Sequence, residues 1–224
     1  MTKRVLVLVE GQTEERFVKD VLAPAFWRHE LYIEPTVLMT KRVKDGPNFR
    51  GGVTNFIKFK NDVNRLLNDA GDALVTTFLD YYALPADFPG MMTRGQNATG
   101  SQCVLHVEAE LHKHFGSANN FLPFLALHEF EALLFSDADI LPRVMNSSNK
   151  QAEFSAIRNS FDNPEEINNR PETAPSKRIL RLFPGYRKTL HGPITATRIG
   201  LKSICEACPH FSAWVDKLED FARL

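Results

Sequence analysis

The stretch VLVLVEGQTEERF, residues 5–17, decides the fold that the sequence predicts. It begins β-branched and leucine-rich, which is typical of a strand buried on both faces, and we expect that strand over 4–9. A helical pattern follows over 13–29, with Thr13 as the candidate N-cap. The turn between them has one glycine and opens with Glu10, so it should repel phosphate unless a cation intervenes. Glu10 is therefore the first candidate for a functional group.

Strand and helix patterns continue to alternate along the first half of the chain. This spacing predicts a Rossmann-like α/β fold, in which helices flank both faces of a mainly parallel sheet. The ligand crevice of such a fold lies outside the carboxyl ends of the strands. We expect further strands at 31–40, 73–79 and 121–127, and helices at 53–69 and 102–115. Three of the expected strands run into acids: Glu10, Asp80 and Glu129.

The second half of the chain loses the strand pattern after residue 136 and becomes helical and rich in loops. We therefore expect an α/β core over 1–136 and a helical, basic C-terminal extension over 137–224 that packs on the core. Within the extension, helices are expected around 194–205 and 211–222.

Charge is unevenly distributed in this half. Residues 129–166 hold eight acids against three Lys or Arg, whereas residues 170–202 hold eight Lys or Arg against one acid. Two interpretations are open: ordinary solvated helix faces, or a surface for phosphate groups beside a cation site.

Composition excludes several classes of protein. The 224 residues carry 27 Lys and Arg against 27 Asp and Glu, so net charge argues neither for nor against nucleic acid. The sequence has no signal pattern and no apolar run of the ~18–20 residues that span a bilayer, so we expect a soluble, cytoplasmic protein without a membrane partner. Cys103, Cys205 and Cys208 fit buried or incidental thiols better than a disulfide framework or a zinc site. No G-x-x-x-x-G-K-[ST] motif is present, so any ATP requirement would come from a partner.

Clustered carboxylates at the strand ends need a counter-charge. Like charges about 4 Å apart repel by roughly 4 kcal/mol at an intermediate dielectric, and a divalent cation removes that cost. Mg²⁺ binds oxygen ligands, often one or two carboxylates together with a substrate phosphate. We therefore expect Mg²⁺ or Mn²⁺ at this edge of the sheet; the alternative is that the acids are helix caps or exposed loop residues.

Several motifs resemble those of a known family. VEGQTE (9–14) resembles the first motif of Toprim domains, and LDYY (79–82) places Asp80 like the first Asp of their D-x-D motif. The chain as a whole is similar to a Toprim-like family of bacterial proteins of unassigned chemistry, related to the Toprim nuclease part of OLD-type defence proteins. Further motifs that carry this resemblance are LHEFEALLFSD (127–137), PEEIN (164–168), APSKRI (174–179), YRKTLHG (186–192) and CPHF (208–211).

The resemblance implies roles for individual acids. Glu10 matches a metal ligand that can also act as a general acid or base, Glu14 matches a supporting ligand, and Asp80 matches the metal-binding Asp. Tyr82 stands where the second Asp of D-x-D is expected, which puts a two-metal mechanism in doubt.

Acids further along the chain could replace the missing ligand. We expect Glu129 to lie nearer the metal and Glu131 to be second, while Asp137 is a weaker candidate.

Basic residues supply candidates for contact with phosphate. We assign Lys177 and Arg178 to charge stabilisation in the transition state, and Arg50, Lys188 and His191 to binding of nucleic acid. Ordinary surface charge remains the alternative for each of them.

Together these features predict a Mg²⁺-dependent phosphodiester-cleaving enzyme that acts on nucleic acid, with DNA favoured over RNA. The resemblance adds a role in phage defence with an AAA-type ATPase encoded nearby. A second hypothesis, motivated by Tyr82, is a non-catalytic module that docks on an ATPase or on nucleic acid. A third, a phospho-acceptor receiver domain, fits Glu10-Gly11 and the long C-terminal extension poorly.

Overall fold

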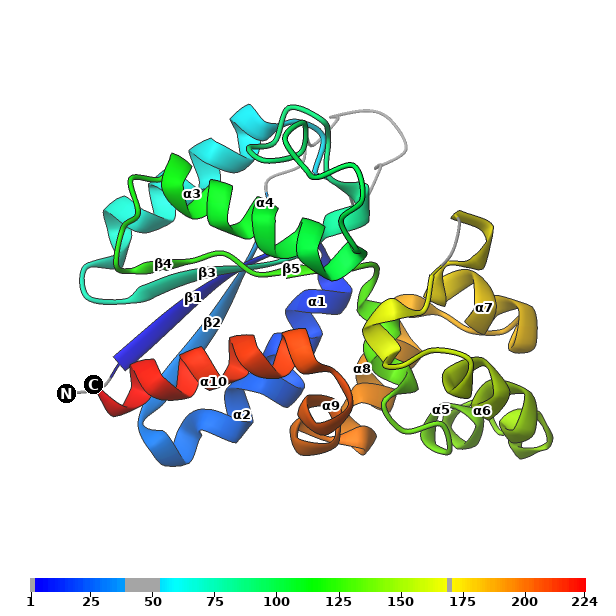
Figure 1. Cartoon of the computed structure of the whole chain (residues 1–224). Helices are drawn as coiled ribbons and strands as arrows, with labels where there is room; N and C mark the ends of the chain where they lie inside the picture. The colour runs from blue at the N-terminus through cyan, green and yellow to red at the C-terminus, as the bar shows by residue number, and fades with distance from the viewer. Residues whose placement is uncertain (1–2, 39–52, 169–170) are drawn as a thin grey trace, which may run out of the picture.

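A parallel sheet forms the centre of the protein, whose computed structural model describes residues 3–38, 53–168 and 171–224 (Figure 1). In these ranges the sheet has five strands in the order β2-β1-β3-β4, and β5 also pairs with β3. All the pairings are parallel, which confirms the predicted α/β fold. The strands are β1 (Lys3–Val9), β2 (Leu31–Val37), β3 (Leu74–Asp80), β4 (Phe121–Leu122) and β5 (Leu125–Ala126).

Each face of the sheet carries its own hydrophobic cluster. Side chains alternate along a strand, so Val5 and Val7 of β1 enter one cluster and Leu6 and Leu8 enter the other. Figure 1 shows helices over both faces of the sheet. Those over the second face are α3 (Phe56–Ala70) and α4 (Gly100–His114); those over the first are α1 (Gln12–Phe17), α2 (Ala23–Phe26) and α10 (Pro209–Arg223).

The connection from β1 to β2 is one helical run, as the sequence predicted for 13–29. It begins as α1, widens into a π-helical turn at η1 (Val18–Leu22), continues as α2 and ends in a 3-10 turn at η2 (Trp27–His29). Parallel strands need such a crossover, because a tight turn would reverse the chain. The crossover carries the first acids of the chain to the carboxyl end of β1.

Most of the remaining helices lie beyond the carboxyl ends of the strands (Figure 1). One hydrophobic cluster runs from β1 through this region to α10 and crosses residue 136, so the expected core and extension share apolar packing. No helix in the described ranges is both long and apolar enough to cross a bilayer. The helices are α5 (Ile140–Val144), α6 (Gln151–Asn159), α7 (Pro175–Leu182), α8 (Lys188–Ile199) and α9 (Leu201–Ala207). Short 3-10 turns are η3 (Tyr81–Ala83), η4 (Phe130–Phe135), η5 (Ser148–Lys150), η6 (Pro164–Glu166) and η7 (Pro171–Thr173).

Two predicted elements are interrupted in the structure. The strand expected over 121–127 is divided into β4 and β5, and Pro123, which lacks an N–H, lies between them. The helix expected over 194–205 is divided into α8 and α9 at Gly200, whose φ of 83° is outside the helical region.

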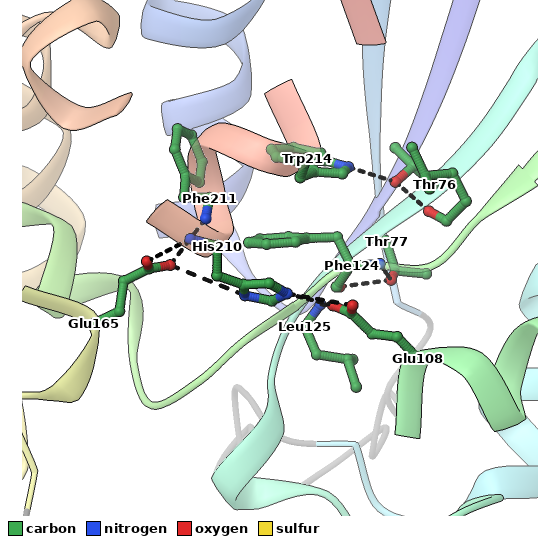
Figure 2. Close-up of polar contacts among 10 residues, drawn as sticks. Thr76, Thr77, Glu108, Phe124, Leu125, Glu165, His210, Phe211 and Trp214 are labelled. Atoms are coloured by element: carbon green, nitrogen blue, oxygen red, sulfur yellow. Dashed lines mark hydrogen bonds and ion pairs between the residues drawn. The ribbon is translucent and has the colours of Figure 1, made fainter. Parts of the chain in front are cut away.

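The C-terminal helix α10 is fixed to the sheet by aromatic packing and a buried hydrogen bond (Figure 2). Trp214 stacks on Phe124, with ring centroids 4.5 Å apart and an interplanar angle of 13°. The indole Nε1–H of Trp214 donates to Thr76 Oγ1 at 2.9 Å. Helix α10 is therefore attached to β3 and to the segment that leads into β5.

The N-terminus of α10 is capped by a carboxylate from a distant segment. Glu165 of η6 accepts hydrogen bonds from the backbone N–H groups of His210 (2.8 Å) and Phe211 (3.0 Å). The side chain of His210 makes a second contact, in which its Nε2 lies 3.1 Å from Glu108 Oε1. The same oxygen of Glu108 accepts a hydrogen bond from Leu125 N at 2.8 Å. Figure 2 shows His210 lying between the two carboxylates. This network joins α10, η6, α4 and β5.

Protonation of His210 strengthens that network. Burial lowers the pKa of His210, but the hydrogen bond and charge of Glu108, together with the charge of Glu165, outweigh burial and the repulsion of Lys217, so the pKa is raised. A histidine whose pKa is raised on folding stabilises the fold fully below its unfolded pKa, about 6.5. This contribution is lost as the pH rises through the folded pKa.

We predict that His210→Gln removes a pH-dependent part of the stability. At pH 6 the variant should be about 1–3 kcal/mol less stable than wild type, because a charged hydrogen bond is lost, and the deficit should shrink by pH 9. Urea unfolding at both pH values measures this. His29→Gln, at an exposed position, is the matched control. An equal deficit at pH 6 and pH 9 would show that the charge of His210 is irrelevant.

Candidate functional site

Acidic side chains meet where β1 and β3 end. Glu10 follows the last residue of β1, and Asp80 is the last residue of β3. Because β1 and β3 are adjacent and parallel, their carboxyl ends lie side by side, and Asp80 N donates to Glu10 Oε2 at 3.3 Å. The strand ends therefore bring together two acids that are 70 residues apart in sequence.

Glu14 joins them from the first turn of α1, where the helix dipole favours an acid. Its side chain is buried, and it lies close to the turn that precedes the helix. A Cβ added to Gly11 would come 3.3 Å from Glu14 Oε2, so the glycine in E-G-Q-T-E leaves room for this carboxylate.

Glu131 in η4 adds a further carboxylate beside these acids. It is the most buried of them, with an exposed fraction of 0%. The hydroxyl of Tyr186 donates to its Oε1 at 3.4 Å. The ammonium of Lys188, the first residue of α8, lies 3.1 Å from Glu131 Oε2 and 3.6 Å from Glu14 Oε1. Among the described residues, Lys188 thus places a positive charge beside these acids. We call the four acids Glu10, Glu14, Asp80 and Glu131 the acidic cluster.

Helix α8 approaches closely because it carries Gly192, one turn after Lys188. A Cβ at Gly192 would lie 3.1 Å from Phe130 Cε1, 3.2 Å from the Tyr186 hydroxyl and 3.5 Å from Thr13 Cγ2. The lack of a side chain lets α8 pack against α1 and η4 and places the ammonium of Lys188 within reach of both carboxylates.

Asp80 is the least compensated member of the acidic cluster. Its side chain is buried, and its Oδ1 has no hydrogen-bond partner among the described residues. Burial raises the pKa of Asp80; Lys188 lowers it, but Glu10, Glu14 and Glu131 raise it further, so it is held well above the ordinary range. The charge of Lys188 therefore does not offset the effects of burial and of the neighbouring carboxylates on Asp80.

The pKa values of Lys188, Glu131 and Tyr186 are also shifted by burial and by the charges of their neighbours. Burial lowers the pKa of Lys188, but Glu131, Asp80 and Glu14 outweigh burial and raise it, so Lys188 is a permanent ammonium. Burial raises the pKa of Glu131, although Lys188 opposes this. Burial and the charge of Glu131 raise the pKa of Tyr186, which therefore remains a hydrogen-bond donor.

Glu129 forms hydrogen bonds with residues outside the acidic cluster. Its Oε2 accepts from Ser176 N at 2.8 Å, and its Oε1 accepts from Ser176 Oγ at 3.0 Å and from the Tyr82 hydroxyl at 2.9 Å. Burial and Glu129 raise the pKa of Tyr82, which keeps its proton. Glu129 therefore anchors the start of α7, whereas Glu131 faces Lys188. The order in which the two acids approach a bound metal stays a prediction.

The other predicted basic residues have different partners, although the ring of His191 also packs against Tyr186, with centroids 5.9 Å apart. Lys177 is exposed on α7; Arg178 donates through Nε to Thr173 O at 2.7 Å and lies over the Phe161 ring, 5.2 Å from its centroid. His191 Nδ1 accepts from the backbone N–H of Arg187 at 2.8 Å, which caps the start of α8.

Arg50, which the sequence assigned to binding of nucleic acid, lies outside the described residues. His128 directly precedes Glu129. Burial lowers the pKa of His128 to about 4, so that residue is neutral at physiological pH.

The acidic cluster suits a hard cation with few protein ligands. Among the described residues no group of three or more His, Cys, Asp or Glu is arranged to hold a metal ion. Mg²⁺, however, often keeps several waters and takes only one or two carboxylates together with substrate phosphate. The neighbouring pair Glu10 and Asp80, with the buried Oδ1 of Asp80, fits that requirement.

Sequence reasoning missed Tyr186 and Gly192 and gave Lys188 a peripheral role. The signal lay in YRKTLHG, because Lys188 and Gly192 are four residues apart and share one face of a helix. A glycine on the same face as a lysine indicates close helix packing beside the ammonium.

The fold and the acidic cluster define an α/β protein with a carboxylate-rich site at the carboxyl edge of a parallel sheet. The chain belongs to the family described as Domain of unknown function (DUF4276), whose model matches residues 9–219. A search of curated proteins gave no match. Among solved structures, the chain is similar to the C-terminal region of the Burkholderia pseudomallei OLD protein, with 14% sequence identity and a TM-score of 0.46 over 99% of this chain and 100% of that chain. This similarity carries no inference about activity.

We predict that Asp80→Asn stabilises the metal-free protein at neutral pH. A carboxyl whose pKa is raised on folding costs stability as the pH rises through that pKa, so Asn should gain about 1–3 kcal/mol at pH 8 and less at pH 5. Urea unfolding in EDTA measures the gain, with Asp72→Asn, exposed at the opposite end of β3, as the control. A loss of stability at pH 8 would contradict the charge imbalance.

Proposed function

We propose that the protein is a Mg²⁺- or Mn²⁺-dependent enzyme that hydrolyses phosphodiester bonds in nucleic acid. The observation that carries this proposal is the pair Glu10 and Asp80, in which Asp80 Oδ1 is buried without a hydrogen-bond partner among the described residues. Burial raises the pKa of Asp80, and the neighbouring carboxylates raise it further although Lys188 lowers it, as expected of a carboxyl in a crowded acidic site.

In this proposal Glu10 and Asp80 hold the divalent cation, and Glu14 and Glu131 surround them. A bound Mg²⁺ polarises a phosphoryl oxygen and lowers the pKa of a coordinated water. Hydrolysis would join the water oxygen to phosphorus, with a proton of that water passing to solvent, and would break the bond to the leaving sugar oxygen, which takes a proton from solvent. Lys188 supplies positive charge beside the phosphoryl group.

Basic groups outside the acidic cluster would hold the nucleic acid. Residues 170–202 carry eight Lys or Arg, and Lys177, Arg181 and Arg187 have exposed side chains there. We propose that Lys177, together with Arg50 and His191, contacts backbone phosphates, and that duplex DNA is the preferred substrate. Because Arg178 donates to Thr173 O, its proposed part is to support the start of α7.

The Toprim-like resemblance of the motifs motivates a wider proposal. We propose a cytoplasmic role in phage defence beside an AAA-type ATPase, since the chain has no P-loop motif with which to bind ATP itself.

A non-catalytic module is the second candidate, and Lys188 favours it. Its ammonium already neutralises part of the charge of Glu14 and Glu131, as a purely structural acid cluster would require. Such a module would dock on an ATPase or on nucleic acid without cleaving it. Calorimetry with Mn²⁺ separates the candidates, because the module has no need to bind the metal.

We predict that the wild type nicks supercoiled plasmid DNA when Mg²⁺ or Mn²⁺ is present. Glu10→Gln and Asp80→Asn should each lower the rate at least about 100-fold, because each removes a metal ligand. The assay includes single-stranded DNA and RNA as substrates. Glu15→Gln, which lies in the same turn of α1 but pairs with Lys19, should retain activity. An inactive wild type on all substrates, or an active Glu10→Gln, would refute the catalytic proposal.

A further inference from the structure

One large aromatic side chain lies exposed beside the acidic cluster. Tyr82 follows Asp80 by two residues, in η3, and 46% of its surface is exposed. Burial raises the pKa of its hydroxyl, Glu129 and Asp80 raise it further, and Lys188 lowers it. The phenol of Tyr82 therefore lies within electrostatic reach of both Asp80 and Lys188.

Three other aromatic residues of this region are buried. Tyr81 and Phe88 pack in the hydrophobic cluster of the second sheet face, and Tyr186 packs in that of the first. In the part of the chain that the structure describes, Tyr82 belongs to neither cluster. Core packing therefore accounts for the positions of the three buried rings but not for that of Tyr82.

The hydroxyl of Tyr82 fixes the position of its exposed ring. It donates to Glu129 Oε1 at 2.9 Å, and Glu129 is itself held by the backbone N–H and the hydroxyl of Ser176. The backbone of Tyr82 is fixed as well, because the buried strand β3 ends two residues earlier at Asp80. A ring that is already ordered loses little conformational entropy when a ligand stacks on it.

Such a ring suits a nucleobase. Aromatic side chains stack on bases of any sequence, because every base has a π-face. Inside a duplex both faces of a base are covered by its neighbours. A protein side chain can therefore stack only on a base that is unpaired or has left the helix.

We propose that the ring of Tyr82 is a stacking platform for an unpaired nucleobase beside the acidic cluster, and that the protein prefers duplex DNA in which one nucleotide lacks a partner. This inference rests on the proposed function, because it names the form of nucleic acid that the same site takes. Contacts from basic groups to backbone phosphates are alike in every duplex and carry no such preference. Tyr82 adds the selection for a base outside the helix.

A DNA duplex that carries one unpaired 2-aminopurine tests this inference. Stacking on an aromatic ring quenches the fluorescence of 2-aminopurine. The full chain is titrated in EDTA and again with Ca²⁺, which binds oxygen ligands as Mg²⁺ does. Wild type and Tyr82→Phe should quench the fluorescence, because both carry the ring, whereas Tyr82→Leu should not. Tyr82→Leu should also bind this duplex about 5- to 100-fold more weakly, with an unchanged dependence on salt, because no phosphate contact is lost.

Two controls separate the ring from the fold. Tyr32→Leu replaces a tyrosine that is 52% exposed near the start of β2, at the opposite end of the sheet, and should quench as wild type does. Tyr82→Phe and Tyr82→Leu both lose the hydrogen bond to Glu129 and should melt at similar temperatures. A difference in quenching between these two variants then reports the ring.

Quenching by Tyr82→Leu equal to that by wild type would overturn the inference, and so would equal affinity of wild type for this duplex and for its fully paired counterpart. Loss of quenching in Tyr82→Phe would assign the effect to the hydroxyl and would overturn it too, as would an absence of binding by wild type. Failure of the proposed function looks different, because wild type would then quench 2-aminopurine but would not nick DNA with Mg²⁺ or Mn²⁺.

Discussion

The ion pair between Lys188 and the buried carboxylates is the interaction on which the site depends. Glu131 is fully buried, and an isolated carboxylate in such a position costs several kcal/mol unless it is paired and hydrogen-bonded. The ammonium at 3.1 Å and the Tyr186 hydroxyl together meet that requirement. Because the same ammonium also reaches Glu14, it joins α1, η4 and α8 at the carboxyl edge of the sheet.

The rest of the fold keeps these groups in place. Adjacent parallel strands bring Glu10 and Asp80 together, Gly11 and Gly192 remove side chains that would crowd the carboxylates, and Glu129 anchors α7. At the N-terminus of α10, the Glu108–His210 contact and the Glu165 cap hold this helix against β5. Since β5 pairs with the last residues of β3, this network supports the strand that carries Asp80.

The sequence could predict the parts of this arrangement that local patterns encode. The alternation of strands and helices indicated a parallel sheet, and acids at the ends of strands indicated where Glu10 and Asp80 would meet. Long-range packing could not be read in the same way. Whether Glu129 or Glu131 faces the cluster depends on the backbone of η4 and on Ser176, 47 residues away from Glu129. The position of Lys188 depends on the packing of α8 against α1, for which the glycine of YRKTLHG was the one local signal.

The most direct test of the account is a crystal structure of the protein soaked with Mn²⁺, with data collected for anomalous scattering. The account predicts an anomalous peak within ligand distance of Glu10 and Asp80, with Lys188 still in contact with Glu131. It would be contradicted by a structure without a peak at this edge of the sheet.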